Sequence, residues 1–471
     1  MRQGGWLELL RGGNAARSAV VGGGMIIHAI STFIVVTILP SVVREIGGLQ
    51  FFAWSTTLYV LACLLGGAVC ARLLARAGAR GSYRVALPVF ALGTLVCAMA
   101  PSMPVLLAGR AIQGLGAGTL SALSFSMVRT LFDEALWSRA LSLTSAAWGV
   151  ATLAGPAVGG VFAEYHAWRA AFWSVFALVP FLLLLVERSL PRDLPRPAAP
   201  ATRLAWLNLC VLCGTALAVS VGSSAPQAPA NAAGLAAALV GLGLFVRLEA
   251  SGRRLLPHSA CNPTTALGAA YAAMMLLVIG FTTEIFVPYF LQVLHGMTPL
   301  HAGYLSALMS AGWTAGAIAG ASQADSGVRA LLTAGPLLLA GALAGMFVLV
   351  PQPGVLGDVR LWAIGACLFG QGLGIGAAWP HLCAKVFAFA PEAEKDLAAT
   401  SITIVIMIAN ALGSALGGMV TNLAGMTNPG GPAGAAPAAA WLFGAYVPAP
   451  LLAFLAVRRL LDVHVVLARA R

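Results

Sequence analysis

The glycine-rich segment QGLGAG at Gln113–Gly118 lies within a long apolar run and recurs 258 residues later as QGLGIG at Gln371–Gly376. A second pair has the same offset, because GPAVGG at Gly155–Gly160 recurs as GSALGG at Gly413–Gly418. Small residues at helical spacing let neighbouring helices approach closely. Two matches at one offset therefore predict two related halves with closely packed helices.

Composition places these halves in a membrane. Hydrophobic residues make up 59% of the 471 residues and charged residues only 9%, and the mean hydropathy is +0.89, well above that of soluble domains. Apolar runs long enough to cross roughly 30 Å of hydrocarbon recur along the whole length. We therefore expect an all-α integral membrane protein in contact with the lipid bilayer, without a separate soluble domain, a cofactor or a metal site.

Hydrophobic runs between charged or Pro/Gly-rich breaks predict fourteen spans. A twelve-helix count with an unusual middle stays open, because the seventh and eighth spans are short and Ala-rich. The repeat predicts an N-terminal six-helix half (1–188), a linker with two extra spans (189–258) and a C-terminal six-helix half (259–471). The fourteen spans cover residues 18–43, 53–74, 84–101, 104–128, 140–163, 168–187, 204–223, 231–248, 266–292, 302–322, 330–350, 361–385, 398–424 and 437–458.

Lysine and arginine residues predict the orientation. If the N-terminus is cytoplasmic, the inside loops and tails hold twenty-three of the twenty-seven; the outside loops hold Arg44, Arg169 and Arg360, and Arg110 lies within a span. The positive-inside rule predicts this bias for an even number of spans. We expect a multi-pass protein of the cell (inner) membrane with both termini cytoplasmic. Because the arginines are spread loop by loop, we expect no nucleic-acid partner.

Six short motifs are spread over nearly the whole chain: WSTTLY at Trp54–Tyr59, RAIQGLG at Arg110–Gly116, GPAVGG at Gly155–Gly160, WRAAF at Trp168–Phe172, FVPYFLQ at Phe286–Gln292 and PLHAG at Pro299–Gly303. Together they resemble the major facilitator superfamily, and specifically its fourteen-helix drug:proton antiporter branch. The resemblance implies two pseudo-symmetric six-helix halves plus two inserted helices. It also implies rocker-switch alternating access, with spans 1, 4, 9 and 12 around a central cavity. The span-5 motif, here Gly155, Pro156, Gly159 and Gly160, is associated with export by antiport.

The sequence departs from the pattern of this family at two places. Aligning Leu39-Pro40 with the family puts Ser31 where an Asp usually stands in span 1. The loop between spans 2 and 3, which normally reads Asp-Arg-x-Gly-Arg-Arg, reads ARAGAR from Ala75. This gating loop keeps its cations and loses its acid, so we expect it to be held by cation contacts to the ends of spans. Its candidate residues are Arg72, Arg76, Gly78 and Arg80.

Ionisable side chains within spans are candidates for function, because burying one in hydrocarbon costs at least about 2.5–3.5 kcal/mol. Of the fifteen acids, only Glu284 lies within a predicted span away from its ends. We expect Glu284 to carry the coupling ion, Arg110 to set the affinity for that ion, and His28 to be the substitute. The alternatives are that Glu284 is a hydrogen-bonding carboxyl that never titrates, that Arg110 is structural or binds an anionic substrate, and that His28 is a satisfied core histidine. Gln113, Tyr289 and His381 are candidate polar residues of a mainly apolar substrate cavity.

Glu284 lies about 8 residues, or roughly 12 Å, from the outer end of its predicted span. Arg110 lies at a comparable depth in span 4, so contact between them across the two halves is geometrically possible. Burial makes a carboxyl easier to protonate, whereas a nearby guanidinium favours the carboxylate. A rearrangement that joins or parts this pair could therefore load and release a proton.

These observations favour a monomeric secondary active transporter that exports small amphipathic organic molecules, a drug or metabolite, in exchange for a coupling ion, the proton. A proton-linked importer of a small metabolite and a transport-inactive membrane sensor stay open. An enzyme would need paired carboxylates or a metal cluster facing water, which the sequence does not offer. No Walker phosphate loop is present, which disfavours primary transport.

Overall fold

The structure, a computed structural model, describes Leu9 and residues 11–133, 136–191, 205–224, 228–252, 254–320, 325–354 and 357–469. Every element of regular secondary structure in these residues is a helix, as expected where hydrocarbon offers no hydrogen bonds to the backbone. The elements before the predicted linker are α2 (Gly12–Ile46), η1 (Leu49–Phe51), α3 (Trp54–Ala98), α4 (Met103–Leu131), α5 (Trp137–Glu164) and α6 (Trp168–Ser189).

The remaining elements continue the helical pattern to the end of the described chain. They are α7 (Trp206–Ser224), α8 (Ala228–Ala250), α9 (Ala266–Phe281), η3 (Thr282–Phe286), α10 (Val287–His295), α11 (Pro299–Gly320), α12 (Asp325–Leu349), α13 (Asp358–Phe389), η4 (Glu392–Glu394), α14 (Lys395–Leu423), α15 (Gly431–Tyr446) and α16 (Pro448–Arg469).

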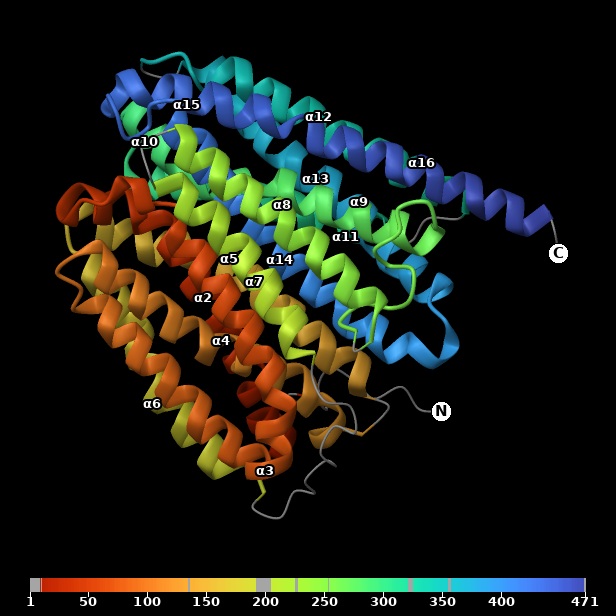
Figure 1. Cartoon of the computed structure of the whole chain (residues 1–471). Helices are drawn as coiled ribbons and strands as arrows, with labels where there is room; N and C mark the ends of the chain where they lie inside the picture. Colours follow the sequence, from red (N-terminus) through yellow and green to blue (C-terminus); the bar gives the residue numbers. More distant parts are fainter. Residues whose placement is uncertain are drawn as a thin grey trace. The chain divides into compact units, whose positions relative to one another are not determined.

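The chain divides into two compact units. The first comprises Met1–Gly48 and Leu58–Arg203, and the second comprises Leu49–Thr57 and Leu204–Arg471. Within the first, α2 packs against α4, α5 and α6 (Figure 1). Within the second, α13 packs against α11 and α12, and α14 packs against α7 and α9. The helices expected as an insert, α7 and α8, pack against each other in the second unit, and the predicted three-part division stays a prediction.

The described residues contain twelve helical stretches that are long and apolar enough to cross a membrane, where the sequence predicts fourteen. One of them, Leu49–Ala98, covers the predicted span 53–74 and most of the predicted span 84–101, because α3 joins two helical segments across a kink at the non-helical residue Gly78. Helix α11 coincides with the predicted span 302–322 but is not among the twelve. Its sequence is rich in glycine, alanine and serine, which makes it less apolar than the other spans.

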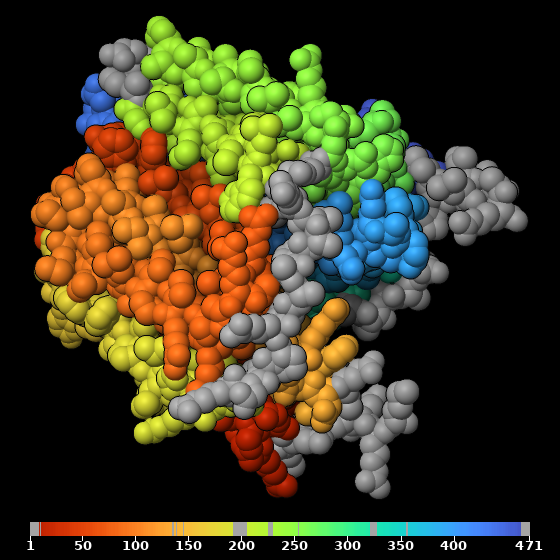
Figure 2. Space-filling view, turned by 60° about the horizontal axis from the view of Figure 1, so that its bottom comes forward, coloured from red at the N-terminus to blue at the C-terminus, as the bar shows by residue number. Residues whose placement is uncertain are grey.

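Helix α8 carries a broad exposed apolar surface. Leu239 and Val240 are 63% and 71% exposed. Figure 2 shows the yellow-green and green atoms of α7 and α8 as a wide face of the second unit. Lipid tails are as apolar as leucine, so such a surface needs no protein partner inside a bilayer.

The repeated glycines occupy equivalent positions in the two units. A Cβ on Gly118 would lie 2.0 Å from the carbonyl oxygen of Cys63 in α3, and a Cβ on Gly376 would lie 2.1 Å from the carbonyl oxygen of Trp313 in α11. Only a residue without a side chain permits this approach of two helix backbones. The same close approach recurs at Gly114, Gly116, Gly372 and Gly374.

The predicted span 266–292 is not one continuous α-helix. It is divided into α9, the 3₁₀ segment η3 and α10. Pro288 lies in the first turn of α10, where a missing backbone N–H costs little. In an uninterrupted α-helix its ring would clash with the carbonyl group of Glu284, four residues earlier. The predicted single helix 437–458 is likewise divided, into α15 and α16, at Val447 and Pro448.

Candidate functional site

A basic side chain is buried inside the first unit. Arg110 of α4 is 1% exposed, and its guanidinium carbon lies 3.8 Å from the centroid of the Tyr59 ring. Its Nη1 donates to Gln113 Oε1 at 2.6 Å, and Gln113 Nε2 donates to Thr94 Oγ1 of α3 at 2.9 Å. An aromatic face and hydrogen-bond acceptors can replace part of the water that a buried cation loses. Two predicted site residues, Arg110 and Gln113, therefore belong to one polar network.

His28 and Ser31 of α2 extend this network. His28 Nδ1 lies 2.9 Å from the Tyr59 hydroxyl oxygen, and Ser31 Oγ lies 3.1 Å from the same oxygen. The Trp148 ring meets the His28 ring edge-on, with 5.5 Å between centroids. Because the Tyr59 ring lies against Arg110 and its hydroxyl contacts His28, Tyr59 links two of the predicted ion-coupling residues.

Tyr59 is a site residue that the sequence reasoning missed. Tyr59 could have been chosen from the sequence, because it is the last residue of the WSTTLY motif at the start of span 2. Ser31, the position of the usual family acid, contacts the Tyr59 hydroxyl and also donates to the His28 carbonyl oxygen at 2.9 Å. The acid of the usual pattern would thus stand inside this same network.

The predicted ion-coupling acid of the second unit, Glu284, lies in η3. Its side chain is partly buried, and its carboxyl interacts with the Ser310 side chain of α11. The preceding residue, Thr283, donates from Oγ1 to Gln371 Oε1 of α13 at 3.2 Å. Polar side chains from three segments therefore gather where the helix is broken. Glu284 and Arg110 lie in different units, so the expected contact between them stays a prediction.

Aromatic rings adjoin this polar cluster within the second unit. The Trp313 ring of α11 lies 5.2 Å from the Phe281 ring of α9 and 5.6 Å from the Trp379 ring of α13, between centroids. Trp313 follows Ser310 by three residues, which places both on one side of α11. Both tryptophans are partly exposed. A few polar groups beside aromatic surfaces suit a small amphipathic ligand.

The two other predicted cavity residues have different surroundings. Tyr289 is 5% exposed and packs against Phe52, with 5.5 Å between ring centroids. His381 Nε2 lies 3.1 Å from the carbonyl oxygen of Gly320 at the end of α11. These contacts hold neighbouring helices together, and a role in a cavity stays a prediction for both residues.

Two arginines at and just after the predicted gating loop, Arg80 and Arg84, contact the end of α6. Arg80 Nε donates to the Leu190 carbonyl oxygen at 2.5 Å, and Arg80 Nη1 lies 3.6 Å from Glu187 Oε2. Arg84 donates to both carboxylate oxygens of Glu187, at 2.6 and 2.7 Å. A bidentate arginine–carboxylate pair fixes direction as well as distance. The acid of this arrangement, Glu187, was not singled out from the sequence.

Gly78 interrupts α3 at the centre of this loop. Its φ of 69° and ψ of −178° are not helical, and a residue with a side chain rarely adopts such a positive φ. Arg72 is half-buried and Arg76 is exposed. A role of Gly78, Arg72 and Arg76, together with Arg80, in gating stays a prediction.

The span-5 motif packs α5 closely against α2. A Cβ on Gly155 would lie 2.3 Å from Phe33 Cβ, and one on Gly159 would lie 3.0 Å from the Ile34 carbonyl oxygen. Glycine therefore has a packing reason at both positions. The motif also contains Pro156, inside the helix, and Gly160, which is buried.

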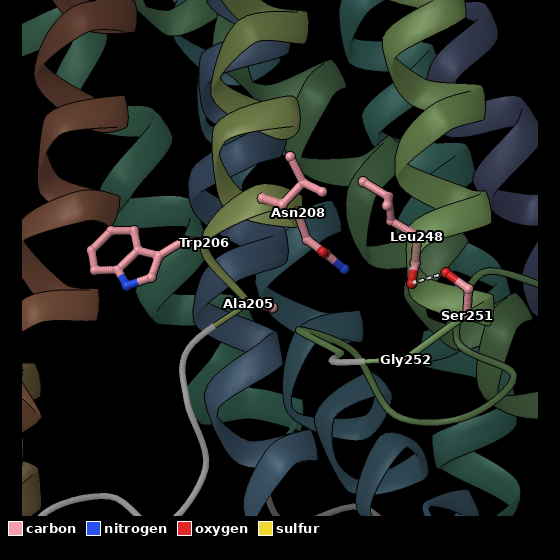
Figure 3. A pocket seen from close by; sticks show the side chains of 7 residues that line it. Ala205, Trp206, Asn208, Leu248, Ser251 and Gly252 are labelled. Carbon is pink, nitrogen blue, oxygen red and sulfur yellow. Dashed lines mark hydrogen bonds between the residues drawn. The ribbon is translucent and has the colours of Figure 1, made fainter.

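A separate cavity of about 330 Å³ lies where α7 begins and α8 ends. In Figure 3 the Asn208 side chain points from α7 toward Leu248 and Ser251 near the end of α8. None of the residues that line it is a predicted site residue. They are Ala205, Trp206, Leu207, Asn208, Leu248, Ser251 and Gly252.

Glu249, beside this cavity, corrects the expectation that Glu284 is the only acid within a span. It lies in the last turn of the candidate span Pro229–Ala250 and is 6% exposed. Its carboxylate accepts hydrogen bonds from Asn208 Nδ2 at 2.5 Å and from the backbone N–H groups of Leu255 and Leu256. Burial and this carboxylate raise the pKa of the Cys261 thiol to about 11. Glu249 therefore organises the connection after α8.

No group of three or more His, Cys, Asp or Glu side chains that could hold a metal ion occurs in the described part of the chain. The predicted ion-coupling residues instead belong to two polar networks, one in each unit. The network of the first unit carries a cation, and that of the second carries a carboxyl group. Such groups can bind an ion or a polar part of a small molecule, and they can exchange a proton.

The sequence matches the Major Facilitator Superfamily over residues 21–365. A Mycobacterium tuberculosis protein named as a probable multidrug-efflux transporter is 36% identical over 434 residues, which cover 89% of this chain and 90% of that protein. The tetracenomycin C resistance and export protein of Streptomyces glaucescens is 26% identical over 374 residues, covering 77% and 68%. A D-xylose–proton symporter of known structure has the same fold, with a TM-score of 0.63, 15% identity and coverage of 94% and 97%. The chain is a multi-pass membrane protein that belongs to the Major Facilitator Superfamily.

Proposed function

We propose that this protein is a proton-coupled exporter of small amphipathic organic molecules in the inner membrane. The observation that carries the proposal is the 36% identity, over 89% of the chain, with a protein named as a probable multidrug-efflux transporter. The close packing of the span-5 glycines agrees with an antiporter. The partly exposed Trp313 and Trp379 offer an apolar surface to such a molecule.

We also propose fourteen crossings with both termini in the cytoplasm. Helix α3 has 45 residues, enough for two crossings of about 20 residues each, and its helical geometry is interrupted at Gly78. Its middle carries Gly78 and four arginines, a composition that suits a cytoplasmic turn between two crossings. Helix α11, with 22 residues, is long enough for a further crossing.

In this proposal Glu284 carries the proton. Its place in a 3₁₀ break supports this role, because interrupted helices in transporters leave polar groups available to ions and substrates. Arg110 lowers the proton affinity of Glu284 when alternating access brings the two together, and His28 is the next titratable candidate. The molecule to be exported binds when the proton has been released.

Everted membrane vesicles test the direction and the coupling. With an imposed inward-acidic proton gradient, vesicles that contain the protein should accumulate ethidium or doxorubicin several-fold above vesicles without it, because their lumen corresponds to the outside of the cell. A protease should remove a tag after Arg471 from everted vesicles but not from intact cells, which verifies the orientation.

Two other results would contradict export. Gradient-dependent accumulation by intact cells, with none by everted vesicles, would indicate a proton-linked importer. Equal probe fluxes in vesicles with and without the protein would show that it does not transport these molecules, and would favour a membrane sensor.

The gating loop provides a second prediction. We expect Arg80→Ala to lower transport several-fold at unchanged membrane abundance, because the contacts of Arg80 with Glu187 and the Leu190 carbonyl oxygen are lost. Arg76→Ala should lower transport less, since Arg76 is exposed. Initial rates in everted vesicles, normalised to the amount of protein, measure both effects. Unaltered transport rates in both variants would show that the loop has no part in the transport mechanism.

A further inference from the structure

A buried amide in the second unit is satisfied at one end only. Gln371 of α13 is 0% exposed, and its Oε1 accepts a hydrogen bond from Thr283. Its Nε2 has no hydrogen-bond partner among the residues that the structure describes. A buried donor without an acceptor lowers stability, because its hydrogen bonds to water have been lost without replacement.

The repeat shows that this position need not be unsatisfied. Gln113 occupies the same place in the first unit, at the offset of 258 residues, and both ends of its amide are bonded, to Arg110 and to Thr94. At the same offset the counterpart of Arg110 is Leu368. A glutamine is therefore present at this position in both units. In the first unit both ends of its amide are bonded within the protein, whereas in the second unit its Nε2 has no partner among the described residues.

The unsatisfied amide is located at the break in the α9–α10 segment. Thr283, which bonds its other end, immediately precedes Glu284, and the carboxyl of Glu284 interacts with Ser310. Trp313 lies one turn beyond Ser310 along α11. The free donor thus belongs to the polar cluster that adjoins the aromatic rings, and not to a remote part of the unit.

We propose that Gln371 is a specificity-determining residue, whose Nε2 donates a hydrogen bond to an acceptor group, such as a carbonyl oxygen, on the transported molecule. The inference rests on the proposed export function and adds the class of chemical group that the site recognises. Because Gln371 is enclosed in the described conformation, the acceptor reaches it in another state of the transport cycle. A buried donor without a partner lowers the stability of the protein. Such a residue is expected at a functional site, where activity can require a group that is unfavourable for stability.

Stability distinguishes this role from a structural one. Gln371→Leu should raise the melting temperature of the purified protein by about 1–3 °C, because it removes an unpaired polar group. Thr283 keeps an acceptor, the Gly280 carbonyl oxygen at 3.4 Å. The matched variant Gln113→Leu should lower the melting temperature by several degrees, because Arg110 and Thr94 each lose a buried partner.

Transport by the same variant identifies the recognised group. Doxorubicin carries carbonyl acceptors on a planar body, whereas ethidium is planar and has none. In everted vesicles Gln371→Leu should raise the KM for doxorubicin about 5- to 10-fold, the effect of one hydrogen bond, and leave the KM for ethidium unchanged.

Each contrary result has a distinct meaning. A melting temperature lowered as much as in Gln113→Leu would make Gln371 a structural residue and overturn the inference. Unchanged doxorubicin transport, or a loss confined to ethidium, would also overturn it, and so would a wild-type protein that exports ethidium but never doxorubicin. A wild-type protein that exports neither probe would instead overturn the proposed function on which the inference rests.

Discussion

Glu284→Gln is expected to abolish transport driven by a proton gradient while leaving substrate binding and downhill exchange in place. Glutamine has nearly the shape of glutamate and can still hydrogen-bond Ser310, but it cannot take up or release a proton. The expected flux under an imposed pH gradient is therefore lower by at least about tenfold, down to the level of protein-free liposomes. Purified protein in liposomes, with and without the gradient, measures both activities.

The control is a carboxyl-to-amide change elsewhere in the same unit. Glu392 has a side chain that is 87% exposed, and Glu392→Gln should leave the flux unchanged. If Glu284→Gln kept wild-type gradient-driven flux, the carboxyl would be a hydrogen-bonding group that never titrates. His28 would then be the first residue to test, because it lies in the buried network of Arg110 and Tyr59.

The repeated glycines lead to the second large effect. Gly118→Ala and Gly376→Ala should each destabilise the folded protein by about 1–3 kcal/mol or more, because the added methyl group meets a helix backbone. The colliding atoms are the carbonyl oxygens of Cys63 and Trp313, 2.0 and 2.1 Å from the ideal Cβ positions. A backbone in a packed helix cannot turn aside as a flexible side chain can. The melting temperature and the monodisperse fraction after detergent extraction measure the loss.

The chain offers a matched control for this effect. Gly149 of α5 and Gly243 of α8 are also helical, and a Cβ at either position would meet no heavy atom within 4 Å. Alanine is the better helix former by about 0.5–1 kcal/mol, so these substitutions should leave stability unchanged or raise it. Equal melting temperatures for the Gly118 and Gly149 variants would contradict the close helix packing.

The glycine pattern shows how much of the fold could be predicted. Gln113–Gly118 and Gln371–Gly376 predict related helices with close neighbours, and equivalent glycines do meet backbone atoms in both units. Such packing is readable from the sequence because only one residue type permits it. The sequence singled out Arg110, Gln113 and His28 separately, and the structure shows that all three belong to one buried network around Tyr59. In hydrocarbon an ionisable or amide group must find a partner, so polar residues in apolar helices tend to gather.

Other features could not be predicted, because the same residue type occurs in several surroundings. Pro40 and Pro156 lie inside continuous helices, whereas Pro288 adjoins a 3₁₀ break. Membrane helices tolerate proline where neighbours satisfy the freed backbone groups, so its presence does not say where a helix is broken. Glu249 was missed for a related reason, since it lies one residue beyond the predicted end of span 8 and its burial depends on Asn208.

Hydropathy and charge distribution were enough to predict a helical membrane protein, because both can be read from neighbouring residues. The glycine repeat, at one fixed offset, predicted two related halves. The same patterns identified several polar side chains in apolar runs, such as Arg110 and His28, but not Glu249. The structure was needed to show which polar groups meet. The Tyr59 ring lies against Arg110, Glu187 contacts Arg80, and Gln371 Nε2 has no hydrogen-bond partner among the described residues. Such pairings depend on which faces of distant helices approach one another. The packing of whole helices determines this, and the residues that adjoin each side chain in the sequence do not.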